Sequence, residues 1–248
     1  MTETATRTLP SLYRDPVPLR SDQHAGWQLQ QADLAFAKDC NAVPVVLEEF
    51  AIVGANYPIL FAGDALTPVA ALGLRGANCF VQDGRWAEGC YVPAYVRRYP
   101  FVLIELDATE EGGAQSLLAI DQAAPHLAQQ AVEGGTALFD EGTPAQSLRN
   151  AMAFCEQLSI GHAATLDFVN ALRAHELLVP RHAELRLEDG STCNLHGFQV
   201  IDAQRLDALD DAILANWHRR GWLAAAHFHL SSLRQFDTLL RLETAQAS

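Results

Sequence analysis

The residues best suited to hold a ligand lie in one stretch, Tyr91–Phe101, which reads YVPAYVRRYPF. Its prolines restrict the backbone, and its two adjacent arginines can each bind a carboxylate through paired hydrogen bonds. Tyrosine adds a ring for stacking and a hydroxyl. We therefore predict a binding surface for a carboxylate ligand, a peptide or a partner enzyme, roofed by Trp86 and formed by Tyr91, Tyr95, Arg97, Arg98 and Tyr99.

A structural interpretation of the same stretch stays open. Neighbouring side chains point in different directions, so at most one of the two arginines can point inward, and a buried guanidinium must be paired. On this interpretation the inward arginine is tied to a carboxylate and the tyrosines complete the core. The candidate carboxylates are Glu48, Glu49 and Asp107.

A second candidate site is the His227-Phe228-His229 sequence. On a strand the two imidazoles would face the same way, and Asp237 could complete the two-histidine, one-carboxylate iron site of an oxygenase. On a helix the two side chains diverge by about 200°. The surrounding alanines and Leu230 favour a buried helix, so a metal-dependent enzyme is the alternative hypothesis.

Familiar enzyme signatures are absent from the sequence. It contains no phosphate-binding loop of the GxxxxGK[ST] type, no dinucleotide fingerprint, no HExxH and no GxSxG. Gly73–Gly76 reads GLRG, which predicts a turn. We assign no catalytic residue and no cofactor, and a non-enzymatic binding protein is favoured over an enzyme.

Charge and cysteine content limit the binding partners and the cellular compartment that we expect. Thirty acidic residues against 17 basic ones give 248 residues a net charge of −13, which disfavours binding to nucleic acid. No apolar run is long enough to span a membrane, and no signal peptide precedes the chain. Five widely spaced cysteines without a CxxC pair indicate reduced thiols, so we expect a cytoplasmic protein.

The pattern of apolar residues predicts an α+β fold. Residues 1–24 are polar and rich in proline, which is typical of an extended arm, with a strand or a partner-binding tail as alternatives. Residues 25–248 are predicted to form a single domain, β-rich over 43–121 and helical over 144–242.

Several local signals place individual elements. Asp83-Gly84 predicts a hairpin turn. Two helices are expected between Pro144 and Leu178, and Asp202 is expected to cap a helix that ends at Gly221. Between these helices lies a β-hairpin, for which we predict a three-residue Asp189–Ser191 loop. That loop would place Leu185 opposite Leu195, Leu187 opposite Cys193 and Glu184 opposite His196.

The chain resembles the SapC family of bacterial proteins over about residues 40–242. The YVPAYVRRYPF block is the most specific part of the resemblance. Further matching segments are VPVVLEEF (Val43–Phe50), YPILF (Tyr57–Phe61), PVAALGL (Pro68–Leu74), NCFVQDGRW (Asn78–Trp86), LLAID (Leu117–Asp121), ALF (Ala137–Phe139), the GFQVID and LDALDD stretch (Gly197–Asp211) and HLSSLRQFDTL near the end.

What the resemblance implies about function is limited. The family takes its name from a surface-layer-associated member, so a structural role in a surface layer is a further alternative. Some relatives carry a permease label, which a chain without a predicted membrane span does not fit. Members of the family are often encoded near flavin-dependent halogenases and iron-dependent oxygenases, which suggests an accessory role beside such enzymes. We therefore expect an accessory protein that presents the Tyr91–Phe101 surface to a peptide, a carboxylate ligand or such a partner enzyme.

Overall fold

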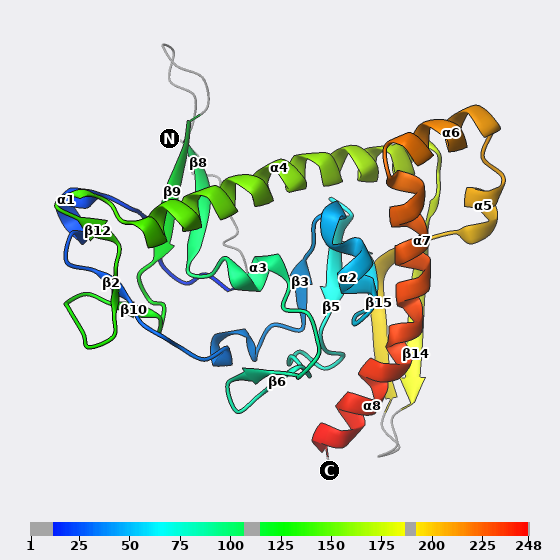
Figure 1. Cartoon of the computed structure of the whole chain (residues 1–248). Coiled ribbons are helices and arrows are strands. Elements are labelled where there is room, and N and C mark those ends of the chain that lie inside the picture. The colour runs from blue at the N-terminus through cyan, green and yellow to red at the C-terminus, as the bar shows by residue number, and fades with distance from the viewer. Residues whose placement is uncertain (1–11, 107–114, 187–191, 248) are drawn as a thin grey trace, which may run out of the picture. The chain divides into compact units, whose positions relative to one another are not determined.

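The computed structural model describes residues 12–106, 115–186 and 192–247. By its internal contacts the chain divides into two compact units, each built from two segments (Figure 1). Unit 1 comprises Met1–Phe36 and Arg98–Gln157, and unit 2 comprises Ala37–Arg97 and Leu158–Ser248. Small antiparallel sheets dominate the first half of the chain and helices the second, which confirms the predicted α+β class.

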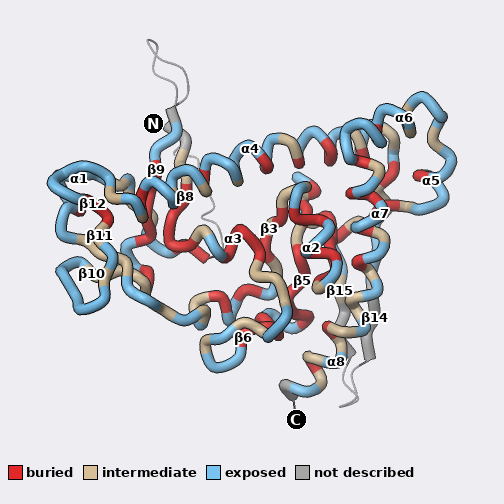
Figure 2. Tube along the Cα trace, viewed as in Figure 1, coloured by how far each residue is buried: buried red, intermediate tan, exposed pale blue. Residues whose placement is uncertain are grey.

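Unit 1 is built on a three-stranded antiparallel sheet. Its order is β1 (Pro16–Pro18), β9 (Gln115–Asp121) and β8 (Phe101–Leu106). Successive strand residues alternate between the faces, so directly opposed apolar residues share one face. That face packs on the first turns of α4 (Gln146–Ala174) to form the core (Figure 2), which contains the pairs Phe101–Ile120 and Leu103–Leu118 together with Leu148 and Cys155 of α4.

Short elements complete unit 1. A second three-stranded sheet has the order β10 (Leu127–Ala128), β2 (Gln28–Leu29) and β11 (Thr136–Ala137). A two-residue turn then joins β12 (Phe139–Asp140) to β13 (Thr143–Pro144) just before α4 begins.

Unit 2 is built on a five-stranded antiparallel sheet. Its central strand, β4 (Ile59–Ala62), has Ile59, Leu60 and Phe61 all buried, because both faces of the sheet are covered at this position. In spatial order the strands are β14 (Leu178–Arg186), β15 (Thr192–Ile201), β4 (Ile59–Ala62), β5 (Thr67–Ala71) and β3 (Ala42–Pro44).

Helices pack around this sheet. α7 (Trp222–Ser232) contacts β15 and β4, and α2 (Phe50–Gly54) packs against α7. Four aromatic rings join the helices of unit 2 into one cluster: Phe50, Phe168, Trp217 and Trp222. The remaining helical elements of the unit are η2 (Leu47–Glu49), α3 (Ala94–Arg97), α5 (Ala203–Asp207), α6 (Asp211–Arg219), η3 (Leu233–Gln235) and α8 (Phe236–Ala247).

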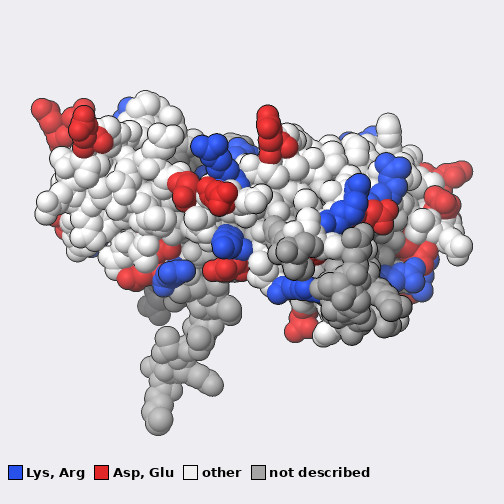
Figure 3. Space-filling model, turned by 90° about the horizontal axis from the view of Figure 1, so that it is seen from below, with Lys and Arg blue, Asp and Glu red and all other residues white. Residues whose placement is uncertain are grey.

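Acidic and basic side chains are interspersed on the surface. On the face that Figure 3 shows, arginine and carboxylate groups occur in small neighbouring clusters. The net charge of −13 is therefore not gathered into one acidic field on that face. None of the described helices combines the length and the apolar character that crossing a membrane requires.

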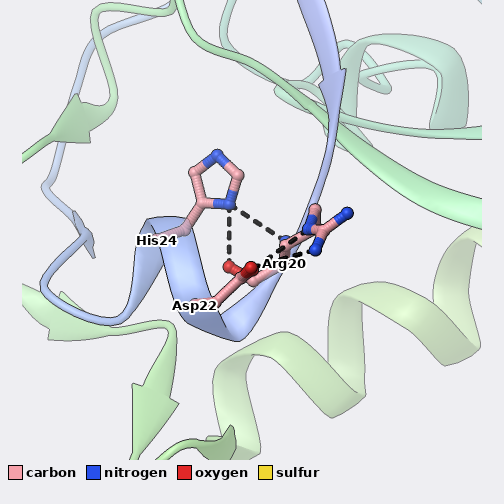
Figure 4. Close-up of polar contacts among 3 residues, drawn as sticks. All are labelled: Arg20, Asp22 and His24. Carbon is pink, nitrogen blue, oxygen red and sulfur yellow. Dashed lines mark hydrogen bonds and ion pairs between the residues drawn. The ribbon is translucent and has the colours of Figure 1, made fainter.

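The described part of the predicted arm at 1–24 is ordered within unit 1. Pro16–Pro18 forms strand β1, and α1 (Ser21–His24) follows it. The Arg20 backbone N–H donates to Nδ1 of the buried His24 at 3.0 Å, and the Arg20 guanidinium makes two bonds to Asp22 (Figure 4). Because the Arg20–Asp22 pair is exposed, it adds little stability. The proposed division into an arm and a single domain stays a prediction.

Two local signals are confirmed. β6 (Val81–Gln82) pairs with β7 (Arg85–Trp86) around Asp83 and Gly84, whose φ values of 48° and 72° are those that a two-residue hairpin turn requires. Asp202 caps α5, because its side chain accepts hydrogen bonds from the backbone N–H groups of Gln204 and Arg205.

The predicted helix boundaries are wrong in two places. α4 is one continuous helix of 29 residues where two helices were expected, and Gly161 lies within it. The helix expected from Asp202 to Gly221 is instead divided into α5 and α6. Asp207 and Asp211 would repel each other four residues apart on one continuous helix, and aspartate favours a helix start.

The predicted register of the β14–β15 hairpin is also wrong. Leu185 pairs with Cys193, and Glu184 pairs with Asn194 in place of His196. Arg186 pairs with Thr192, and because Cys193 pairs with Leu185 the predicted Leu187–Cys193 pair does not form. The expected Asp189–Ser191 loop lies outside the described residues. The pairing of β14 with β15 also shifts between Arg181 and Ala183, an irregularity that the alternating pattern does not reveal.

Two helical glycines should respond oppositely to substitution by alanine. At Gly54 a new Cβ would lie 3.1 Å from the Phe228 carbonyl oxygen and 3.2 Å from Ser232 Cβ, which hold α2 tightly against α7. We expect Gly54→Ala to lower the free energy of unfolding by about 1 kcal/mol, since overpacking exceeds the gain in helix propensity.

Gly161→Ala is the matched variant. Its new Cβ would meet Glu48 Oε2 at 2.9 Å, but that side chain is exposed and can move away. We expect the free energy of unfolding to rise by about 0.5–1 kcal/mol from helix propensity. Urea titration of both variants measures the difference, and a loss of stability in Gly161→Ala would contradict this account.

Candidate binding site

The predicted Tyr91–Phe101 stretch divides between the two units. Tyr91–Arg97 belongs to unit 2 and Arg98–Phe101 to unit 1. The two adjacent arginines are therefore parts of different compact units, and their surroundings are described separately.

In unit 2 the segment is anchored by the carboxylate of Glu49. This side chain is only 6% exposed, at the end of η2. Glu49 Oε1 accepts one hydrogen bond from the Ala94 backbone N–H and one from the Tyr91 hydroxyl, both at 2.8 Å. A buried carboxylate requires such partners because it has lost its hydration. Glu49 thereby holds the start of α3 and the Tyr91 ring in one place.

Arg97 extends this arrangement to the surface. Its guanidinium donates to the Tyr91 hydroxyl oxygen at 2.7 Å, and its Nε donates to the Val92 carbonyl at 3.0 Å. The Arg97 guanidinium carbon also lies 5.3 Å from the centre of the Tyr91 ring. Arg97 is nevertheless exposed. The chain itself therefore orients a cationic group that solvent reaches.

The main chain at Tyr91 is fixed by residues from outside the predicted set. The Tyr91 N–H donates to Asn56 Oδ1 at 3.0 Å, and the fully buried Tyr57 donates its hydroxyl to the Tyr91 carbonyl. Trp86 Nε1 in turn donates to the Tyr57 hydroxyl oxygen at 2.8 Å. Trp86 is therefore linked to the Tyr91 main chain through Tyr57. Asn56 and Tyr57 were missed, although Tyr57 begins the matching YPILF segment.

The tyrosine hydroxyls of this network remain protonated at neutral pH. Burial and the bond to Glu49 raise the pKa of Tyr91, and burial raises the pKa of Tyr57 strongly. Both groups therefore act as hydrogen-bond donors and acceptors here, and neither is suited to the role of a general base at neutral pH. The chemistry that this arrangement supports is binding.

The unit 1 part of the stretch is mostly internal. Tyr99 is 8% exposed, its hydroxyl donates to Asp121 Oδ2 at 3.1 Å, and its ring stacks on Phe36 at 4.4 Å. Arg98 is half-buried and places its guanidinium carbon 5.5 Å from the centre of the Tyr13 ring. In unit 2, Tyr95 is likewise buried.

Asp121 has the same role in unit 1 as Glu49 in unit 2. It is fully buried and accepts hydrogen bonds from the backbone N–H groups of Arg14, Asp15 and Ala123, in addition to the Tyr99 hydroxyl. These bonds attach the N-terminal segment to the end of β9.

The residues of the metal alternative do not come together. His227 and His229 lie on helix α7, where His227 is exposed and His229 is fully buried. His229 Nε2 accepts a hydrogen bond from the Ile201 N–H at 3.0 Å. Asp237 lies on α8, and no three His, Cys, Asp or Glu side chains within the described ranges form a group that could hold a metal ion.

The chain is thus an α+β protein with a solvent-exposed arginine, Arg97, that Tyr91 and Val92 hold on the one-turn helix α3. Comparison with known families then identifies it, because the SapC family model matches residues 19–239 and the chain therefore belongs to the SapC family. Searches of curated proteins and of solved structures found no significant match.

Removing the Tyr91 hydroxyl should separate Glu49 from Arg97. Tyr91→Phe deletes the donor to Glu49 and the acceptor for Arg97 while keeping the ring. Because it leaves the buried carboxylate with fewer partners, we expect the free energy of unfolding to fall by about 1–3 kcal/mol. Urea titration measures this loss. An unchanged stability in Tyr91→Phe would show that the hydroxyl is not an anchor.

His229 should make stability depend on pH. Burial lowers its pKa from 6.5 to about 3. Below about pH 6.5 the unfolded chain therefore binds a proton that the folded chain does not, and the free energy of unfolding falls by about 1.4 kcal/mol per pH unit as the pH drops toward 3.

Comparison of unfolding at pH 7 and pH 5 tests this assignment. His229→Gln should lose less stability between these values than the wild type, whereas the exposed His227→Gln should behave like the wild type. Equal pH dependence in all three proteins would refute the assignment to His229.

Proposed function

We propose that this SapC-family protein is a non-enzymatic binding protein that holds a carboxylate or peptide group at Arg97, with Tyr91 and Trp86 beside it. The observation that carries the proposal is the combination of exposure and fixed orientation at Arg97. Its bonds to Tyr91 and Val92 fix the guanidinium, and solvent still reaches it.

Fixed orientation matters because exposed ion pairs are normally weak. Much of their Coulomb attraction is offset by the entropy lost when a long, flexible side chain is held in one position. Because Arg97 is bonded to Tyr91 and Val92, its side chain already loses this entropy when the protein folds. A ligand that then meets the guanidinium loses less freedom on binding, which is the advantage of a preorganised site.

The chemistry of the site favours a planar acceptor group. Guanidinium binds carboxylates and carbonyl oxygens through its fork of N–H donors, while the part-exposed rings of Tyr91 and Trp86 offer flat apolar surface. A peptide terminus or an acidic side chain of a protein partner provides this combination. The proposal assigns no contact with the ligand to Tyr95, Arg98 or Tyr99, since Tyr95 and Tyr99 are buried and Arg98 belongs to the other unit.

The partner class is proposed from the family resemblance. An accessory protein that acts beside a halogenase or an oxygenase would need a surface for such an enzyme or for its peptide-like substrate. The exposed, braced Arg97 is the described group best suited to that contact. A cytoplasmic location is part of the same proposal.

The simplest test uses a minimal ligand. ¹⁵N-labelled protein is titrated with N-acetylglycine, which carries a carboxylate, and with its uncharged amide. The carboxylate should shift the Trp86 indole N–H and Arg97 Nε–H resonances in a saturable manner, whereas the amide should bind more weakly. Followed at Trp86, Arg97→Ala should weaken binding about five-fold, which corresponds to about 1 kcal/mol.

Arg98→Ala is the matched control, because it removes the same charge from the neighbouring residue in the other unit. It should leave binding unchanged. Two results would overturn the proposal: no saturable shift at either resonance, or equal weakening in the two variants. Equal weakening would assign the effect to net charge alone.

A further inference from the structure

The turn that follows β5 forms an unusual contact with the C-terminal helix. The chain folds back sharply between Leu72 and Cys79, whose N–H donates to the Leu72 carbonyl at 2.8 Å. The approach is so close at Gly73 that a Cβ there would lie 1.6 Å from the Ala77 carbonyl oxygen. The predicted GLRG turn is therefore present, and its geometry requires glycine at the first position.

This fold exposes two successive backbone N–H groups to one acceptor. The N–H groups of Leu74 and Arg75 both donate to Oε1 of Glu243, the latter at 3.2 Å. The Cys79 thiol also hydrogen-bonds this carboxylate. Burial and the neighbouring carboxylate raise the pKa of Cys79 to about 12, so the thiol keeps its proton and donates it. Consecutive N–H groups that converge in this way form an anion-binding nest.

Glu243 reaches the nest from α8, near the end of the chain. The sequence separation between Glu243 and Leu74 is 169 residues. Glu243 is 6% exposed, and the fully buried Leu239 lies one helical turn before it on the same face of α8. The carboxylate is thus inserted into the nest by an amphipathic terminal helix.

We propose that the Leu74–Arg75 turn is a carboxylate-binding site that the chain's own C-terminal helix occupies with Glu243. Release of α8 would expose the site to another carboxylate. This site is distinct from the one at Arg97, so the inference does not depend on the proposed function.

The expected ligand is a small monoanion. Two peptide N–H groups and a thiol, which are neutral donors, are among the groups that hydrogen-bond Glu243. Such donors can satisfy one desolvated negative charge. A phosphate dianion would bring a second charge into the same buried space, where desolvation is far more costly. Formate and acetate should therefore bind, and phosphate should not.

Chemical rescue of the full-length Glu243→Ala variant tests the proposal. The substitution empties the nest, and formate should bind there in place of the missing carboxylate. At about ten times its dissociation constant, formate should raise the Tm of the variant by about 4 °C relative to sodium chloride of equal ionic strength. The Leu74 and Arg75 backbone amide resonances should shift in the same titration.

Wild-type protein should show neither effect, because Glu243 competes from within the chain. Glu243→Gln should also fail to respond, since its side chain still fills the site. If Glu243→Ala does not fold in chloride, refolding in formate becomes the assay, and folded protein should be recovered in formate alone.

Four results would overturn the inference. Phosphate at equal ionic strength should not replace formate, so an equal Tm rise with both anions would count against a carboxylate nest. An equal Tm rise in wild type and Glu243→Ala would indicate a general salt effect. Unchanged Leu74 and Arg75 resonances, or equal failure to refold in formate and chloride, would show that the nest does not accept an external anion.

Discussion

Desolvated carboxylates are the constraint on which this structure depends. Asp121, Glu49 and Glu243 are each almost completely buried, and each accepts backbone N–H groups from distant parts of the chain. A buried carboxylate without partners costs several kcal/mol, so each of these acids permits only those packings that bring its donors to it. They therefore act as specific long-range attachments between segments that have no regular pairing.

One of these buried carboxylates, Glu49, fixes the geometry of the candidate site. Glu49 holds the Tyr91 hydroxyl and the first turn of α3, and Tyr91 then holds the Arg97 guanidinium. A carboxylate that cannot itself meet a ligand thus decides where the exposed cation points. A buried acid thus positions an exposed cation through one tyrosine hydroxyl.

Features that depend on local hydrogen bonds were predicted correctly from the sequence, and features that depend on long-range packing were not. The Asp83-Gly84 hairpin and the Asp202 cap depend on bonds between residues two to five positions apart, and both were predicted correctly. The register of β14 was not, because its pairing with β15 shifts between Arg181 and Ala183, which the alternating pattern does not reveal. Two helical segments were recognised, but in the structure they form the single helix α4.

By itself, the sequence determined the α+β class and membership of the SapC family. Composition, turn chemistry and a contiguous motif are all readable along the chain. Tertiary structure alone decided that Arg97 is exposed and braced while Tyr99 is internal, and which of thirty acidic residues are buried. The reason is physical: an acidic residue has no local signal of burial, since the donors that satisfy it include backbone N–H groups 45 to 169 residues away.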